Sequence, residues 1–170
     1  TNINGGSCFV GGICYDGQYS KVWKNCHNHG DIEFTKEFTN TGNVRCGGIL
    51  GKHEIENHWA ILEECSNSGN ITFLGHSDSY VRLGGMIGCH RAGAIVVVRN
   101  GFTNSGNITI EETTTVQSET RIGGCIATLQ NNGVDGFTNS GNISVKGTYN
   151  SIVYLGGAVA NPQKPVKNAT

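Results

Sequence analysis

The chain has 170 residues, of which 15% are charged and 26 are glycine, and its formal net charge is −1. This near-neutral balance excludes a strong overall field for nucleic acid or for an anionic membrane surface, so we expect neither partner. No apolar run reaches the roughly 18 residues that a membrane-spanning helix needs, so the sequence predicts no membrane span.

Pairs of glycines followed by apolar residues recur along the chain. They lie at Gly11-Gly12, Gly47-Gly48, Gly84-Gly85, Gly123-Gly124 and Gly156-Gly157, with successive spacings of 36, 37, 39 and 33 residues. A second motif alternates with the first and carries an asparagine two residues before a glycine, at Asn28, Asn67, Asn104 and Asn139. A period of about 36 residues that tolerates small changes in length is typical of a repeat array.

The segments between these markers are short and rich in β-branched residues. Examples in chain order are Asn70-Ile71-Thr72-Phe73, Tyr80-Val81-Arg82-Leu83 and Ala94-Ile95-Val96-Val97-Val98. Their alternation of apolar and polar side chains is typical of strands. Such a unit cannot bury its apolar face alone, whereas stacked copies share one continuous core.

The sequence therefore predicts an all-β fold, a right-handed parallel β-helix (β-solenoid) of about 36-residue repeats. We expect three strands and one coil per repeat, and two smaller coils per repeat are the alternative. The right-handed sense is taken from the usual chirality of parallel connections. Residues 1–160 are expected to form the solenoid, with about 4.5 repeats. Residues 161–170 contain both prolines and are expected to form a tail or linker.

Most of the seven cysteines align with apolar residues of other repeats. Cys26 and Cys65 share a position with Phe102 and Phe137, for example. Because free cysteine packs as a small hydrophobe, we interpret six of them as core thiols. One or two disulfides, or a metal site, are the alternatives. Cys89 aligns with polar residues and is interpreted as the best candidate for a reactive thiol.

The repeated asparagines Asn28, Asn67, Asn104 and Asn139 predict a structural ladder. Side-chain amides on successive coils can hydrogen-bond along the stack. The glycines two residues later suit a corner with positive φ: they are Gly30, Gly69, Gly106 and Gly141. Ligand binding by the asparagines is the alternative.

The combined pattern resembles GLUG-type and related β-helical adhesin repeats of secreted and cell-surface proteins. The matching residues in one copy are Cys65, Asn67, Gly69, Ile71, Gly84, Gly85, Ile87 and Gly88. The resemblance covers roughly residues 5–160, but Ala127 and Ala160 replace the closing glycine in the last two copies. It implies an extracellular scaffold, an adhesin stalk or a fibre component.

Four Asn-x-Ser/Thr sequences are glycosylation candidates, at Asn70, Asn107, Asn142 and Asn168. The first three share one position of the repeat and would place glycans in a stripe. The alternative is that asparagine suits the turn and that Ser or Thr suits an outward strand position.

Arg45, Arg82 and Arg121 also share one position, between two inward-facing apolar residues. Alternation along a strand places them on the outer face, one coil apart. Guanidinium groups bind carboxylate and sulfate bidentately, so we treat these arginines as candidates for binding an acidic glycan. A solvated face paired with nearby glutamates is the alternative.

No other pattern in the sequence indicates a site. His27 and His29 lack a third ligand, so we predict no metal site and no cofactor. The carboxylates do not recur at one position, and we therefore expect no enzymatic activity.

The sequence as a whole predicts a secreted or cell-surface structural or adhesive protein that forms a stiff rod or fibre segment. It would extend by end-to-end self-association or by continuation in a longer chain. A carbohydrate-binding adhesin module that uses the arginines is the alternative, and a polysaccharide-degrading enzyme is less favoured.

Overall fold

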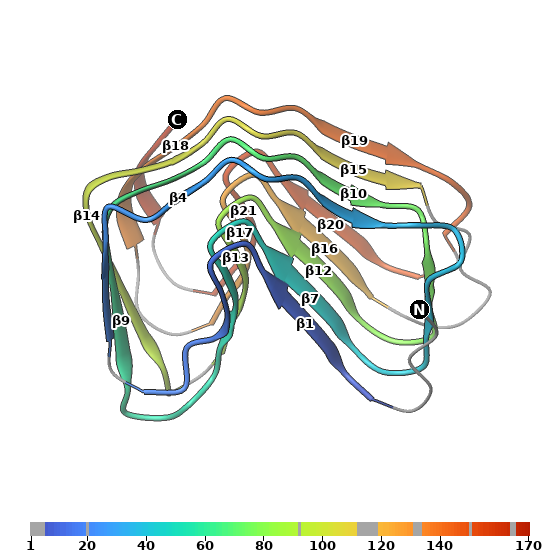
Figure 1. Cartoon of the computed structure of the whole chain (residues 1–170), viewed down its shortest axis with the longest axis horizontal. Coiled ribbons are helices and arrows are strands. Elements are labelled where there is room, and N and C mark those ends of the chain that lie inside the picture. The colour runs from blue at the N-terminus through green and yellow to red at the C-terminus, as the bar shows by residue number, and fades with distance from the viewer. Residues whose placement is uncertain are drawn as a thin grey trace.

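The computed structural model describes residues 6–19, 21–91, 93–111, 119–130, 134–149, 151–163 and 166–170. The chain winds into successive coils of parallel strands, and the described ranges contain no helix (Figure 1). Arg82 is paired with Arg45 and Arg121, which lie 37 and 39 residues away, so each sequence repeat forms one coil. The prediction of an all-β parallel solenoid is confirmed, whereas its right-handed sense stays a prediction.

The described residues form five sheets along the stack, and we number them in the order in which the chain first enters them. Sheet 1 contains β1 (Cys8–Gly11), β7 (Val44–Gly47), β12 (Val81–Gly84), β16 (Thr120–Gly123) and β20 (Val153–Gly156). Sheet 2 contains β2 (Cys14–Asp16), β8 (Leu50–His53), β13 (Ile87–His90), β17 (Ile126–Leu129) and β21 (Val159–Pro162).

The other three sheets complete each coil. Sheet 3 contains β3 (Lys21–Lys24), β9 (Trp59–Asn67), β14 (Ile95–Asn104), β18 (Val134–Asn139) and β22 (Val166–Ala169), and β4 (His27–Asn28) also pairs with β9. Sheet 4 contains β5 (Ile32–Phe34), β10 (Ile71–Phe73), β15 (Ile108–Glu111) and β19 (Ile143–Lys146). Sheet 5 contains only the short strands β6 (Thr39–Asn40) and β11 (His76–Ser77).

Each coil therefore has more strands than the three that we predicted. The difference arises at the Gly-Gly pair, where the chain turns sharply and leaves sheet 1 for sheet 2 (Figure 1). A methyl group on the first glycine, Gly47 or Gly84, would collide with the carbonyl oxygen of Leu50 or Ile87, the first residue of the next strand. Glycine is thus required there by close backbone approach.

The turn at the Gly-Gly pair bends every coil into two arms (Figure 1). In one arm, sheets 1 and 4 enclose a core that includes Phe34, Phe73 and Leu83. In the other arm, sheets 2 and 3 enclose a core that includes Leu62, Met86 and Phe102. The solenoid thus has two separate cores that run side by side along the stack.

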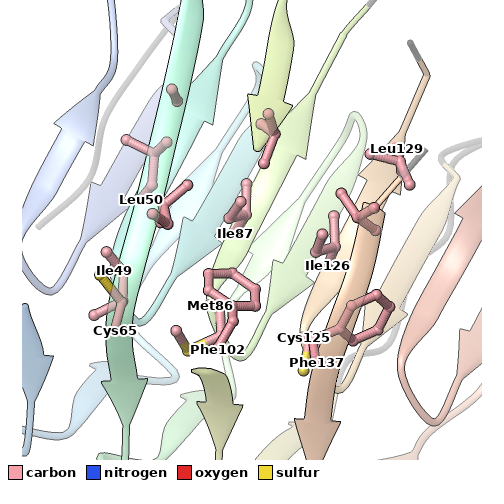
Figure 2. Close-up of a cluster of buried hydrophobic side chains, with 14 residues drawn as sticks. Ile49, Leu50, Cys65, Met86, Ile87, Phe102, Cys125, Ile126, Leu129 and Phe137 are labelled. Carbon is pink, nitrogen blue, oxygen red and sulfur yellow. The ribbon is translucent and has the colours of Figure 1, made fainter. Parts of the chain in front are cut away.

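Equivalent side chains lie directly above one another in the core between sheets 2 and 3. Figure 2 shows Cys65, Phe102 and Phe137 from three successive coils at one level, with Met86 and Cys125 beside them. Phe102 is the register partner of Cys65. Cys65 and Cys125 are almost fully buried in this core, and Cys46 is buried in the other. Their placement agrees with core thiols, and all seven cysteines are free.

We expected residues 161–170 to form a tail or linker, but the residues described there, 161–163 and 166–170, lie against the solenoid. β21 extends to Pro162, and β22 pairs in register with β18. The backbone N–H of Asn139 donates to the carbonyl oxygen of Thr170 at 2.7 Å. Proline was a misleading signal because Pro162 ends an edge strand of the last coil, where its missing N–H removes no ladder bond.

Candidate functional site

A ladder of asparagine side chains occupies the bend between the two arms. The Nδ2 group of Asn28 donates to Oδ1 of Asn67 at 2.7 Å, Asn67 donates to Asn104 at 2.8 Å, and Asn104 donates to Asn139 at 2.8 Å. Each Nδ2 group also donates to the carbonyl oxygen of the glycine two residues later. The amides of Asn28, Asn67 and Asn104 are buried, so these bonds satisfy groups that water cannot reach.

The second glycine of each Gly-Gly pair makes room for this ladder. A Cβ atom on Gly12 would lie 2.6 Å from Cγ of Asn28, and Gly48 and Gly85 would collide in the same way with Asn67 and Asn104. The two motifs of the repeat are therefore the two halves of one contact. Any ligand for the asparagines would have to displace the backbone of the Gly-Gly turns.

The glycines after the asparagines do not have the positive φ that we expected. Positive φ angles at glycine occur among the described residues at Gly93, Gly101, Gly136 and Gly147. A Cβ atom on Gly69 would instead collide with the carbonyl oxygen of Gly30 in the preceding coil, and Gly106 with that of Gly69. Close approach of successive coils, rather than backbone conformation, requires glycine here.

The arginine column lies on the face of sheet 1 that points away from the core, and it reaches across the inner side of the bend. Arg45 donates to the carboxylate of Glu54, Arg82 donates to Sγ of Cys89 at 3.3 Å, and Arg121 donates to Oγ1 of Thr128 at 3.3 Å. Because sheet 2 folds back against this face, the three arginines are only 5, 6 and 8% exposed. Alternation predicted the correct face but not its burial.

Aromatic rings close this column at both ends. Phe9 and Tyr154 are the register partners of Arg45 and Arg121. The guanidinium carbon of Arg45 lies 5.0 Å from the centre of the Phe9 ring, and that of Arg121 lies 5.5 Å from the Tyr154 ring. Each contact is a cation–π interaction that partly offsets repulsion within the column.

Glu54 neutralises much of the positive charge near the first two arginines. Its carboxylate pairs with Arg45 and lies 3.9 Å from Nζ of Lys52 and 3.7 Å from Nε of Arg91. Even so, the Nε–H groups of Arg45 and Arg82 are buried and make no hydrogen bond within the described part of the chain. These two N–H groups are therefore donors without an acceptor in the described part of the column.

Cys89 does not have the features of a reactive thiol. It is fully buried, and burial raises the pKa of its thiol, an effect that Arg82 and Arg45 only partly offset. Reactive cysteines have a lowered pKa and are accessible. The thiol instead supports the bend by contacting Arg82 and Glu54.

The glycosylation candidates form a second ladder on the outer surface. The backbone N–H of Asn107 donates to Oδ1 of Asn70 at 3.0 Å, and that of Asn142 donates to Oδ1 of Asn107 at 2.9 Å. The side chains of Asn107 and Asn142 are exposed. The Oδ1 atoms of Asn70 and Asn107, rather than their Nδ2 atoms, carry the ladder. Asn168 has a φ of 46° and donates to Asp135 at 2.6 Å.

Two pairs of histidines behave differently. Nδ1 of His27 and of His29 each lie 2.7 Å from a serine hydroxyl of the next coil, and no cluster of three metal-ligating side chains occurs in the described ranges. His53 and His90, by contrast, are fully buried and stack with ring centres 6.0 Å apart. Sequence reasoning missed this buried pair, although the alignment of His90 with Leu129 indicates an inward position.

Comparison with known families, with curated proteins and with solved structures found no match to this chain. Within the part of the chain that the structure describes, no helix has the length and apolar character that crossing a membrane requires. The geometry of the solenoid is therefore the basis for the functional proposal.

Proposed function

We propose that the chain is a stiff structural or adhesive segment of a secreted or cell-surface protein, and that it extends by stacking of coils end to end. The observation that supports this proposal is that apolar side chains at both ends of the stack are exposed to solvent, although the equivalent side chains of the inner coils are buried. Extracellular location is supported by the resemblance to adhesin repeats alone.

The C-terminal end exposes side chains that are core residues in every inner coil. Leu155 continues the column of Cys46, Leu83 and Ile122, which are fully buried, yet it is 56% exposed. A hollow of about 330 Å³ lies beside Leu155, Gly156 and Gly157. An added coil would cover all of these groups.

The N-terminal end is open in the same way. Ile13 lies opposite Ile49, which is fully buried, yet Ile13 is 45% exposed, and a hollow of about 340 Å³ lies beside Cys14 and Trp23. Edge strands at both ends carry unpaired backbone groups, which favour pairing with a further strand. Stacking would bury apolar surface and satisfy these groups together.

The asparagine ladder supports head-to-tail stacking in particular. The Nδ2 groups of Asn28, Asn67 and Asn104 each donate to Oδ1 of the C-terminal neighbour. The ladder thus ends with Oδ1 of Asn28 on one side and the Nδ2 group of Asn139 on the other. The two ends are therefore complementary to each other and not to themselves. Such heterologous contacts build open fibres rather than closed dimers.

The test is the association state of the chain and of two charge variants. We expect the parent chain to associate as its concentration rises, seen by sedimentation velocity, and to form filaments of uniform width in electron micrographs. Leu155→Lys should weaken association by at least about 10-fold because a lysine would have to be buried. Thr72→Lys places the same charge on the side of an inner coil and should have no effect.

A chain that stays monomeric at every concentration refutes stacking between copies. Equal weakening by Leu155→Lys and Thr72→Lys would show that charge alone, and not the end surface, controls association. Intact-mass measurement of native material tests whether the candidates Asn70, Asn107, Asn142 and Asn168 are glycosylated, because added mass reports attached sugar.

A second candidate function is binding of an acidic glycan by the arginine column. Because the three side chains are only 5, 6 and 8% exposed, the ligand would have to open the notch between sheets 1 and 2, where it would meet the unbonded Nε–H groups of Arg45 and Arg82. Isothermal titration with a sulfated oligosaccharide tests this candidate. We expect Arg82→Ala to lower the affinity at least about 10-fold and Lys24→Ala, on sheet 3, to leave it unchanged. An Arg82→Ala variant that binds as well as the parent refutes the role.

A further inference from the structure

Two cysteines of neighbouring coils lie directly opposite each other in sheet 3. Lys24 is the register partner of Glu63, and His27 is the register partner of Ser66. Cys26 is therefore opposite Cys65. Parallel strands in register lie about 4.8 Å apart, which falls within the range of about 4.4–6.8 Å between Cα atoms that a disulfide spans.

The two thiols are also held at the same corner of the coil. Cys65 donates to the carbonyl oxygens of Trp23 and Glu63, both at 3.4 Å, and Cys26 donates to that of Lys24 at 3.6 Å. Trp23 belongs to the same coil as Cys26, so the Cys65 thiol already reaches toward the neighbouring strand. Burial raises the pKa of Cys65, and contact with the Cys26 thiol adds to this effect.

We propose that Cys26 and Cys65 form a disulfide that fastens the first coil to the second when the protein meets an oxidising disulfide such as oxidised glutathione. The thiolate of Cys26, the more exposed of the two, attacks the external disulfide and releases one thiol. The Cys65 thiolate then attacks the Cys26 sulfur and releases the second thiol. The two protein thiols are oxidised, and one external disulfide is reduced to two thiols.

No other pair of cysteines is opposed in this way in the described pairings. Cys8 is opposite Val44, Cys14 is opposite Leu50, and Cys89 is opposite Lys52. Cys46 lies two residues beyond Val44, so it is diagonal to Cys8. The Cys8 and Cys46 pair therefore serves as an internal control, because it also spans the first two coils without direct opposition.

The position of the pair gives the bond a mechanical role. In the described structure the first coil has a neighbour on one side only, so its strands can shift by the few tenths of an ångström that a disulfide needs. The bond would then hold this end coil against local opening, which otherwise is easiest at the ends of a stack. This inference does not rest on the proposed rod function.

The experiment uses the full folded chain in a glutathione buffer made progressively more oxidising. Trypsin separates the two cysteines into peptides 25–36 and 53–82, each of which contains one cysteine. We expect mass spectrometry to find these two peptides joined, and the thiol count of the unfolded chain to fall by two from seven. Hydrogen exchange of β1 and β3 amides should slow about 10-fold on oxidation.

Cys26→Ser should abolish the linkage, and Cys14→Ser should leave it intact. The proposal fails if peptides 25–36 and 53–82 stay unlinked while glutathione is attached elsewhere. It fails too if peptide 46–52, which carries Cys46, is joined as readily to peptide 1–21, which carries Cys8 and Cys14, in the Cys14→Ser variant. It also fails if the urea-unfolded chain forms the same link with equal yield, because the folded register would then have no part in it.

Discussion

Replacing Asn67 with alanine tests whether the amide ladder holds the two arms of the coil together. The side chain of Asn67 is 1% exposed and makes three hydrogen bonds: it donates to Gly69 and Asn104, and it accepts from Asn28. Removal breaks all three bonds and leaves a buried N–H group of Asn28 and Oδ1 of Asn104 without those partners.

The size of the effect follows from the number of bonds. A buried hydrogen bond contributes about 0.5–1.5 kcal/mol net, so Asn67→Ala should lower the free energy of unfolding by about 2–4 kcal/mol. Asn139, at the C-terminal end of the ladder, is only partly buried and makes two of these bonds. Asn139→Ala should therefore cost only about 1–2 kcal/mol.

Urea unfolding followed by circular dichroism measures both variants against the parent. Asn67→Asp is a useful third variant, because it keeps the shape but replaces the donor with an acceptor that faces two oxygens. It should be at least as destabilising as alanine at neutral pH. If Asn67→Ala costs no more than Asn139→Ala, the ladder does not stabilise the bend and our interpretation of the motif is wrong.

Three further changes test other parts of the stack. Gly85→Ala places a methyl group against the Asn104 amide and should cost about 2–3 kcal/mol or more in urea unfolding, whereas Gly157→Ala meets nothing within 4 Å and should change stability by less than about 0.5 kcal/mol. Burial, with a smaller effect of His53, lowers the pKa of His90 to about 4, so between about pH 6.5 and that value the unfolded chain binds more protons than the folded one. As the pH is lowered from about 6.5 to about 4, the free energy of unfolding should fall by about 3 kcal/mol. A His90→Leu variant whose free energy of unfolding still falls as steeply with pH would contradict the assignment of this effect to His90. Glu64 has a φ of 54°, which asparagine adopts more easily, so Glu64→Asn should raise the urea midpoint by an amount equal to about 0.5 kcal/mol, and a lower midpoint would count against backbone strain there.

The repeat, the parallel strands and the stacked columns could be predicted from the sequence because stacking requires equivalent positions to carry compatible side chains. The exchange of Cys65 for Phe102 is an example, since only an inward position accepts both a thiol and a phenyl ring without cost. Cys46 and Leu83 share a position in the same way, and the structure buries both completely.

The bend of the coil could not be predicted, and the remaining differences follow from it. Alternation indicates which face of a strand Arg82 occupies, but not that the chain turns at Gly84-Gly85 and lays sheet 2 against that face. The environment of Cys89 was misread for the same reason, since a polar column is usually an exposed one. Both residues lie in a notch that only the three-dimensional path of the backbone creates.

The matched register of the coils makes length adjustable. Removal of residues 67–103 would join Ser66 directly to Asn104, which occupies the position of Asn67 one coil later. The shortened chain would present the same glycine pair, amide and apolar columns to its new neighbour, and the molecule would lose about 4.8 Å along its axis. Whole coils can therefore be gained or deleted without any compensating change elsewhere. The length of the solenoid can vary in this way while its cross-section stays the same.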